Sequence, residues 1–349
     1  MNVWVMLKQY AIGAALSLSL TAFAADVKVI DGPYEGEKHV KIQGPIAAGD
    51  LVKVQAAAKR AILASENPLT LSLDSPGGDV VESIRIGRFA RELQATTTVD
   101  GVMVFDPDTP DGQSIFSLAK KYSQVAFGTR QAKRGTKVPD STYARCYSSC
   151  VLVFFAGASR NATDNQDMRS QPPRIIPVMG LHRPYYDKER FASLTPAEAR
   201  DAYALLEKEV RGYLAEMNAP DAMVERMFRK ASNAIDLVPI EEFQEYYKAR
   251  ESYSDEWLIA KCKAFGPGAA LTAEEHQQVE HIRQSRKAAM LSGKLTSISA
   301  ADNFVPLGMT RAQVKALDDK VMKHNNESMS CRTAAVRQFQ LQKLTNGPT

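Results

Sequence analysis

The chain has 349 residues, of which 44% are hydrophobic and 24% are charged. This composition is that of an ordinary globular protein and excludes a disordered or fibrous chain. The 44 Lys and Arg residues exceed the 40 Asp and Glu residues by only four, and a net charge of +4 is too small to favour binding to nucleic acid. We therefore expect one large or two moderate domains and no nucleic-acid partner.

The N-terminus has the pattern of a secretory signal peptide. A lysine precedes an apolar run that starts at Ala11 and ends in Ala-Phe-Ala at positions 22–24. Serine and threonine interrupt the run, which is shorter than the about 20 apolar residues that a membrane-spanning helix needs. We expect residues 1–24 to be a signal peptide that is cleaved after Ala24, so that the mature chain starts at Ala25. This predicts a periplasmic or secreted protein without a membrane span after cleavage.

Four cysteines in an oxidising compartment allow three complete disulfide pairings. Cys262 and Cys331 lie in segments with helical patterns, which favours a disulfide between two helices. Cys146 and Cys150 are spaced more widely than in a Cys-x-x-Cys redox motif. For them we favour a disulfide that braces the intervening serines, or two small buried side chains, over a thiolate nucleophile or a redox couple.

The first hundred residues of the expected mature chain alternate between apolar strands and amphipathic helices. We expect strands at 40–42, 69–73 and 96–99, and helices from Asp50 to Ile62 and from Ile86 to Leu93. A glycine-containing turn at 75–79 separates the second strand from the second helix. This order of strands and helices predicts an α/β protein with a βαβ core.

Residues 101–142 have the composition of an insertion. They are rich in Asp, Pro and Gly, and their second half carries a run of basic residues with no acidic residue between them. The basic residues are Lys120, Lys121, Arg130, Lys133, Arg134 and Lys137. We interpret the segment as a solvated flap or lid, with binding to an anionic surface as the alternative.

The rest of the chain is predicted to be strand and then mainly helix. A buried helix is expected from Val151, a buried strand at 175–179, a long helix after the capping box of Thr195 and Glu198, and a strand at 235–238. Further capping patterns begin at Thr272 and Thr310. We place a boundary near 250, which gives a domain at 25–250 and a helical C-terminal region at 251–349.

Three segments carry residues suited to chemistry. The two glycines of Ser75-Pro76-Gly77-Gly78 allow backbone N–H groups to face a negative charge, although a tight turn also requires glycine for steric reasons. Ser148 lies at the start of an apolar helix, where a hydroxyl can act as a nucleophile or as a helix cap. His182 alone among the five histidines follows a buried strand. His276 and His281 are five residues apart, which is not a zinc-binding spacing, so we expect no metal.

In content and order, these three segments resemble the Clp-type serine peptidases of the ClpP/crotonase superfold, in particular its secreted, ATPase-independent relatives. The resemblance covers roughly residues 38–248 and implies the ββα spiral core of that superfold, extended here by C-terminal helices. It implies that Ser148 is the nucleophile, that His182 is the base, and that the N–H groups of Gly78 and Ser149 form the oxyanion hole. It also implies a polypeptide substrate and no cofactor.

Several points stay open at the level of sequence. The acid that orients the histidine in this family corresponds to Asp236, Asn233 or Ser232, and Ser149 is the alternative to Ser148 as the nucleophile. Members of the family form homo-oligomers, but the sequence does not indicate whether this chain does. Two other functions remain as alternatives, a non-catalytic binding module with the same fold and a crotonase-type acyl-CoA enzyme. An exported protein would not meet acyl-CoA, which is a cytoplasmic substrate.

Overall fold

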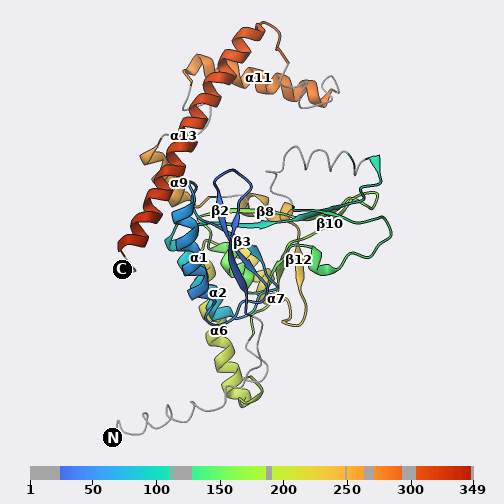
Figure 1. Cartoon of the computed structure of the whole chain (residues 1–349), viewed down its shortest axis with the longest axis vertical. Coiled ribbons are helices and arrows are strands. Elements are labelled where there is room, and N and C mark those ends of the chain that lie inside the picture. The colour runs from blue at the N-terminus through green and yellow to red at the C-terminus, as the bar shows by residue number, and fades with distance from the viewer. Residues whose placement is uncertain are drawn as a thin grey trace.

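The structure is a computed structural model that describes residues 24–110, 113, 128–185, 191–247, 250–262, 271–292 and 304–346. It is a mixed α/β protein, as the sequence predicts, with helices along one side and three sheets (Figure 1). Part of the expected insertion, including Lys120 and Lys121, and most of the expected signal peptide lie outside the described residues.

The largest sheet has five strands in the order β1-β2-β3-β4-β8. The strands are β1 (Asp26–Asp31), β2 (Lys38–Gln43), β3 (Thr70–Asp74), β4 (Thr96–Asp100) and β8 (Ser159–Thr163). All neighbours pair in parallel except β1, which pairs antiparallel with β2. The sequence analysis predicted β2, β3 and β4 and missed β1 and β8. The edge strand β1 has no buried side chain.

Helices connect the parallel strands on one face of this sheet. They are α1 (Asp50–Ala64), α2 (Val80–Glu92) and α4 (Cys150–Phe155). Because crossovers between parallel strands are right-handed and the strand order runs in one direction, the three helices cover the same face. Every residue of α4 is buried, which accounts for its uninterrupted apolar sequence.

The expected insertion contributes strands to a second sheet, with the order β10-β9-β5-β6. Its strands are β5 (Val102–Phe105), β6 (Gly128–Gln131), β9 (Asn165–Asp167) and β10 (Arg174–Ile176). A solvated flap alone is therefore not an adequate description, since β5 pairs with both β6 and β9. The pairing joins segments about sixty residues apart in sequence, which a local pattern does not reveal.

The third sheet, in the order β12-β11-β7, leads to the candidate site. It consists of β7 (Cys146–Tyr147), β11 (Met179–Leu181) and β12 (Asp236–Val238). The single buried strand predicted at 175–179 is wrong. The chain changes sheets at Pro177, so that Ile175 lies in β10 with 51% of its surface exposed and only β11 is buried.

The remaining described elements are mostly helices. They are η1 (Asp140–Thr142), α6 (Pro196–Glu216), α7 (Asp221–Arg229), η2 (Ile240–Phe243), α8 (Gln244–Tyr247), α9 (Ser252–Lys261), α11 (Ala273–Leu291) and α13 (Arg311–Asn346). The predicted capping boxes of Thr195 and Thr272 are both present. No helix in the described ranges is long and apolar enough to cross a bilayer.

The long helix α13 runs beside α1 and α9, while α11 packs against its other end (Figure 1). Gln340 of α13 is fully buried and bridges two elements of the core. It accepts a hydrogen bond from the Leu69 amide and donates one to the Leu93 carbonyl, both at 2.9 Å. Cys262 at the end of α9 forms a disulfide with Cys331 of α13, as expected. The C-terminal helix is thus attached at two places.

Candidate active site

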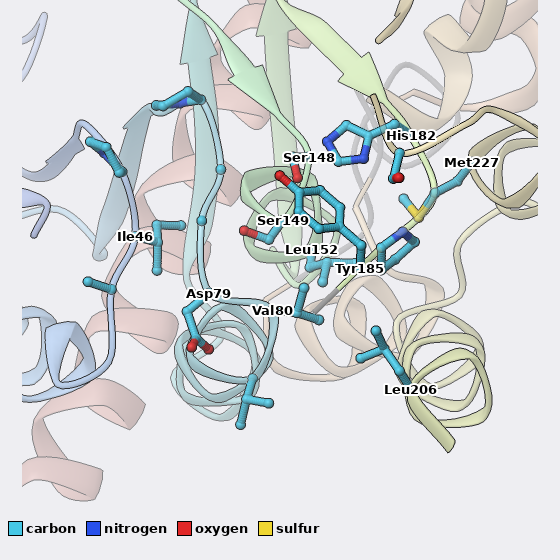
Figure 2. A pocket seen from close by; sticks show the side chains of 18 of the residues that line it. Ile46, Asp79, Val80, Ser148, Ser149, Leu152, His182, Tyr185, Leu206 and Met227 are labelled. Atoms are coloured by element: carbon cyan, nitrogen blue, oxygen red, sulfur yellow. The ribbon is translucent and has the colours of Figure 1, made fainter. Parts of the chain in front are cut away.

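Ser148 and His182 follow the ends of two neighbouring parallel strands. In the register of β7 and β11, Tyr147 lies opposite Gly180, and the Ser148 amide donates to the Gly180 carbonyl at 2.9 Å. The carboxyl ends of parallel strands lie at the same edge of a sheet. This pairing brings two residues that are 34 positions apart in sequence to one cavity, where both form part of the lining (Figure 2).

The backbone at Ser148 has a conformation that residues with a side chain rarely adopt. Its φ angle is 57°, in the left-handed region, which costs a non-glycine residue about 1 kcal/mol or more. Two features hold the turn in place, the bond to Gly180 and a disulfide between Cys146 and Cys150 that closes over the two serines. A residue held in this conformation between a strand and a helix presents its side chain to the cavity, and such backbone outliers are concentrated at functional sites.

The two serines of this turn differ in accessibility. Ser148 is half-buried, whereas Ser149 is only 3% exposed, and the Ser149 hydroxyl has no hydrogen-bond partner among the described residues. Ser149 occupies the capping position of α4 but makes no side-chain capping bond. Of the two candidates for a nucleophile, Ser148 is therefore the one that a substrate can reach.

The glycine turn at 77–78 packs closely against two other segments. A Cβ at Gly77 would lie 2.5 Å from the Cβ of Ser148, and a Cβ at Gly78 would lie 2.0 Å from the Ile46 carbonyl oxygen. Both glycines also have positive φ angles, 98° and 146°. Both positions of this turn therefore require glycine, and at Gly77 one reason is the close contact with Ser148.

The pairing of Ile46 with the turn leaves the Gly78 amide available. Ile46 donates to the Gly77 carbonyl and accepts from the Asp79 amide, both at 2.8 Å. In such a parallel bridge, the N–H group of the middle residue, Gly78, points to the opposite side. Within the described ranges, neither the Gly78 nor the Ser149 amide donates to a protein acceptor, and both residues line the cavity. Both residues thus remain candidates for the oxyanion hole that the resemblance implies.

The hydrogen bond of the His182 ring fixes its tautomer. Nδ1 lies 3.0 Å from the backbone carbonyl oxygen of Arg183. A carbonyl can only accept, so Nδ1 carries the hydrogen of the neutral ring and Nε2 carries the lone pair. His182 is 7% exposed, and its ring centroid lies 5.7 Å from that of Tyr185. Among the described residues, the group that orients the ring at Nδ1 is therefore a backbone carbonyl.

The three candidates for an orienting acid lie in different places. Asp236 pairs through its backbone with Leu181, but its carboxylate accepts two hydrogen bonds from Arg226, at 2.6 and 3.1 Å. These bonds hold the pKa of Asp236 below its ordinary value. Asp236 does not line the cavity, whereas Ser232 and Asn233 do. The two candidates that line the cavity are therefore neutral, and the carboxylate among the three candidates is paired with Arg226 instead.

The cavity around these residues has a volume of about 770 Å³. Apolar side chains form much of its wall, among them Val80, Leu152, Leu206 and Met227 (Figure 2). Asp79 lies at its rim, where its carboxylate caps α2 by accepting from the Glu82 amide at 2.7 Å. A cavity of this size and character can hold an apolar side chain or acyl group next to the Ser148 hydroxyl.

The sequence analysis missed several residues of the cavity. Leu206 and Met227 read as ordinary core positions of helices, and Tyr185 lies in a loop without a recognisable pattern. The segment 45–48 shows only its position between a strand and a helix. Over the described ranges, no cluster of three or more His, Cys, Asp or Glu side chains is arranged to hold a metal ion.

A comparison with protein-family models found none that matches the chain, and a comparison with curated proteins also found no match.

Proposed function

We propose that the chain is an ATP-independent serine hydrolase with a fold of the ClpP/crotonase type and that its substrate is a polypeptide. The observation that carries the proposal is the conformation of Ser148. A half-buried serine with a φ angle of 57° faces a cavity that also contains His182 and the turn at Gly78. A nucleophile, a base and an anion-binding turn are the minimum set of groups for acyl transfer.

In the proposed reaction, the Ser148 hydroxyl attacks the carbonyl carbon of the substrate. A bond forms between Oγ and carbon while His182 Nε2 takes the hydroxyl proton. The imidazolium then gives this proton to the leaving amine as the carbon–nitrogen bond breaks, which leaves an acyl ester on Ser148. Water, activated by the same nitrogen, hydrolyses the ester and regenerates the serine.

The negative charge that develops on the substrate oxygen is assigned to the amides of Gly78 and Ser149. Removing one such donor typically slows catalysis by about 100- to 1000-fold. The Arg183 carbonyl takes the place of the usual carboxylate at Nδ1. A neutral acceptor stabilises an imidazolium less than a carboxylate does, so we expect slower turnover than that of a complete triad.

The compartment favours a peptidase over an acyl-CoA enzyme. The two disulfides fit a secreted or periplasmic protein, since disulfides persist in oxidising compartments. The signal-peptide pattern also indicates a secreted or periplasmic protein, which would not meet the cytoplasmic substrate acyl-CoA. The choice of a polypeptide among acyl substrates rests on the resemblance to Clp-type peptidases.

The test is labelling of the mature protein with a fluorophosphonate, followed by peptide mapping of the adduct. We expect an adduct on Ser148 that is absent in Ser148→Ala, retained in Ser149→Ala, and formed at least about 100-fold more slowly in His182→Ala. Circular dichroism of each variant shows whether it is folded. Folded protein that gives no adduct on either serine would contradict the hydrolase and favour a binding module with this fold.

A further inference from the structure

Ala25, the first residue of the expected mature chain, is buried. It is 3% exposed, whereas the preceding Ala24 is exposed. The backbone nitrogen of Ala25 lies 3.1 Å from Oδ2 of Asp50, and the side chain of Asp50 is completely buried. Cleavage after Ala24 would thus create a new α-amino group beside a buried carboxylate.

Asp50 connects this nitrogen to the segment before α1. The same oxygen, Oδ2, accepts a second hydrogen bond from the Ala47 amide at 2.8 Å. The other oxygen, Oδ1, accepts from the ammonium group of Lys53, whose side chain is 48% exposed. One oxygen of Asp50 therefore bonds to the start of the mature chain and to the Ala47 amide, and the other bonds to the half-exposed Lys53.

The segment held by Asp50 supports the anion-binding turn. Ile46, next to Ala47, makes both of the 2.8 Å backbone hydrogen bonds to the turn around Gly78, and the Ile46 carbonyl is the group that a Cβ at Gly78 would meet. Both Ile46 and Ala47 line the cavity. Hydrogen bonds thus connect the nitrogen of Ala25 through Asp50 to the Ala47 amide, and Ile46, the residue before Ala47 in the backbone, bonds to the turn.

Cleavage after Ala24 changes the charge of the Ala25 nitrogen. In the uncleaved protein, Ala25 contributes a neutral amide, which interacts weakly with a carboxylate. After cleavage the nitrogen is an ammonium group, and hydrogen bonds between ionised partners are roughly twice as strong as neutral ones. Asp50 is already paired with Lys53 through Oδ1, and the ammonium group of Ala25 would be a second charged partner, at Oδ2.

We propose that Asp50 binds the α-ammonium group of Ala25 after cleavage at Ala24 and thereby positions the turn at Gly78 for oxyanion binding. Asp50 is then a positioning residue, because it acts through Ala47 and Ile46 and does not touch the substrate. The effect on reactivity rests on the proposed hydrolase, whereas the pairing of Ala25 with Asp50 does not.

The other charged groups near this contact are already paired. On α1, Lys53 bonds to Oδ1 of Asp50. On α2, Glu82 accepts from the Leu51 amide and from Arg85. On β1, the exposed residues Asp26 and Lys28 pair with each other. An α-amino group titrates at a pH of about 8 in an unfolded chain. The pair with Asp50 requires the charged ammonium form, so its stabilising effect is lost at a pH high enough to deprotonate this group.

The experiment compares two chains that differ by one residue at the N-terminus. One begins at Ala25 and the other at Ala24, each released from a removable N-terminal carrier protein. Asp50→Asn is made in both chains, and Lys53→Gln in both serves as a matched control that removes only the solvent-facing partner of the same carboxylate. Thermal unfolding at pH 7 and pH 10.5 and the rate of fluorophosphonate labelling at pH 7 are measured for every chain.

At pH 7, we expect the chain starting at Ala25 to melt at least about 3 °C higher than the chain starting at Ala24. We also expect it to be labelled about tenfold faster. Both differences should vanish with Asp50→Asn and persist with Lys53→Gln, and the difference in melting should shrink at pH 10.5. Equal melting temperatures and equal labelling rates of the two unsubstituted chains would overturn the proposal, and this comparison does not depend on the folding of any variant.

The readouts separate this inference from the proposed function. A difference in melting without labelling of any chain would reject the hydrolase and retain the pairing of Ala25 with Asp50. Normal labelling of both chains at the same rate, with the same melting temperature, would retain the hydrolase and reject the role of Asp50.

Discussion

Ser148 occupies its position because a neighbouring residue lacks a side chain. Gly77 approaches Ser148 so closely that a methyl group would lie 2.5 Å from the Ser148 Cβ and 2.7 Å from the Tyr147 carbonyl oxygen. Contacts this short cannot be absorbed without movement of the backbone. The strained conformation of the serine and the absence of a side chain at position 77 therefore depend on each other.

Gly77→Ala tests this dependence. We expect labelling of Ser148 to fall by about 100-fold or more, because the turn must move away from the serine and carries the oxyanion donor with it. The matched control is Gly308→Ala. Gly308 also has a positive φ angle, 85° against 98° for Gly77, but a Cβ there meets nothing within 4 Å. Both variants carry the strain of a left-handed alanine, so equal labelling of the two would contradict a specific role for the close contact.

Asp236 has a structural partner, which leads to a different expectation. Arg226 lowers the pKa of Asp236, so the pair stabilises the fold above the unfolded pKa of about 4, and this contribution is lost as the pH falls through the lower folded-state value. Asp236→Asn should reduce the free energy of unfolding by about 1–3 kcal/mol at pH 7, with a smaller loss near pH 3, as measured by urea denaturation. Labelling of Ser148 should change less than threefold. A loss of several orders of magnitude in folded protein would instead identify Asp236 as the residue that orients His182.

Among the helices, α13 is attached to the core by a buried polar contact in addition to the apolar contacts of Leu341 and Leu344. Gln340 is 0% exposed and pairs with the Leu69 amide at the start of β3 and the Leu93 carbonyl after α2. Both hydrogen bonds are buried. The end of α13 therefore completes the hydrogen bonding of elements that lie far away in sequence.

Gln340→Leu leaves both groups without a partner. We expect the free energy of unfolding to fall by about 2–4 kcal/mol, which urea denaturation would measure. Gln338→Leu is the control, since it makes the same replacement at an exposed position of the same helix and should change stability by less than about 0.5 kcal/mol. Equal losses in the two variants would mean that Gln340 is not an anchor.

Local patterns predicted the helices better than the sheets. The capping residues Thr195 and Thr272 mark the starts of α6 and α11, because a cap acts on amides two or three residues away. The strands β5 and β11 have their partners elsewhere in the chain, and nothing in their own residues identifies the sheet to which they belong. The error at 175–179 has this origin, since both halves of that run are apolar although they pair in different sheets.

At the scale of the whole molecule, the sequence indicates the side chains of the candidate site but not the backbone groups that hold them in place. Residue types indicated Ser148, His182 and Gly78, which line one cavity. The partner of His182 Nδ1 is a backbone carbonyl, and the support of the turn is the backbone of Ile46. Every residue has these groups, so no choice of amino acid reveals them.

The residues at the expected boundary near 250 make more contacts with the preceding domain than the sequence suggests. Glu251 is 4% exposed and accepts hydrogen bonds from Arg160 of β8, from Arg91 of α2 at 3.3 Å and from Asn218 at 2.7 Å. Burial alone would raise the pKa of Glu251, but these donors hold it below its ordinary value. The residues that lead into the C-terminal helices are therefore fastened to the central sheet.

The contacts of Gln340 also impose an order on folding during synthesis. Leu69 and Leu93 precede their partner by 271 and 247 residues. Until the segment around position 340 joins the folding chain, the Leu69 amide and the Leu93 carbonyl lack these hydrogen bonds. Because a chain is made from its N-terminus, the central sheet can form before the two hydrogen bonds of Gln340 exist. A nascent chain that stalls before position 340 would thus display an incomplete edge, which is the kind of surface that chaperones and proteases recognise.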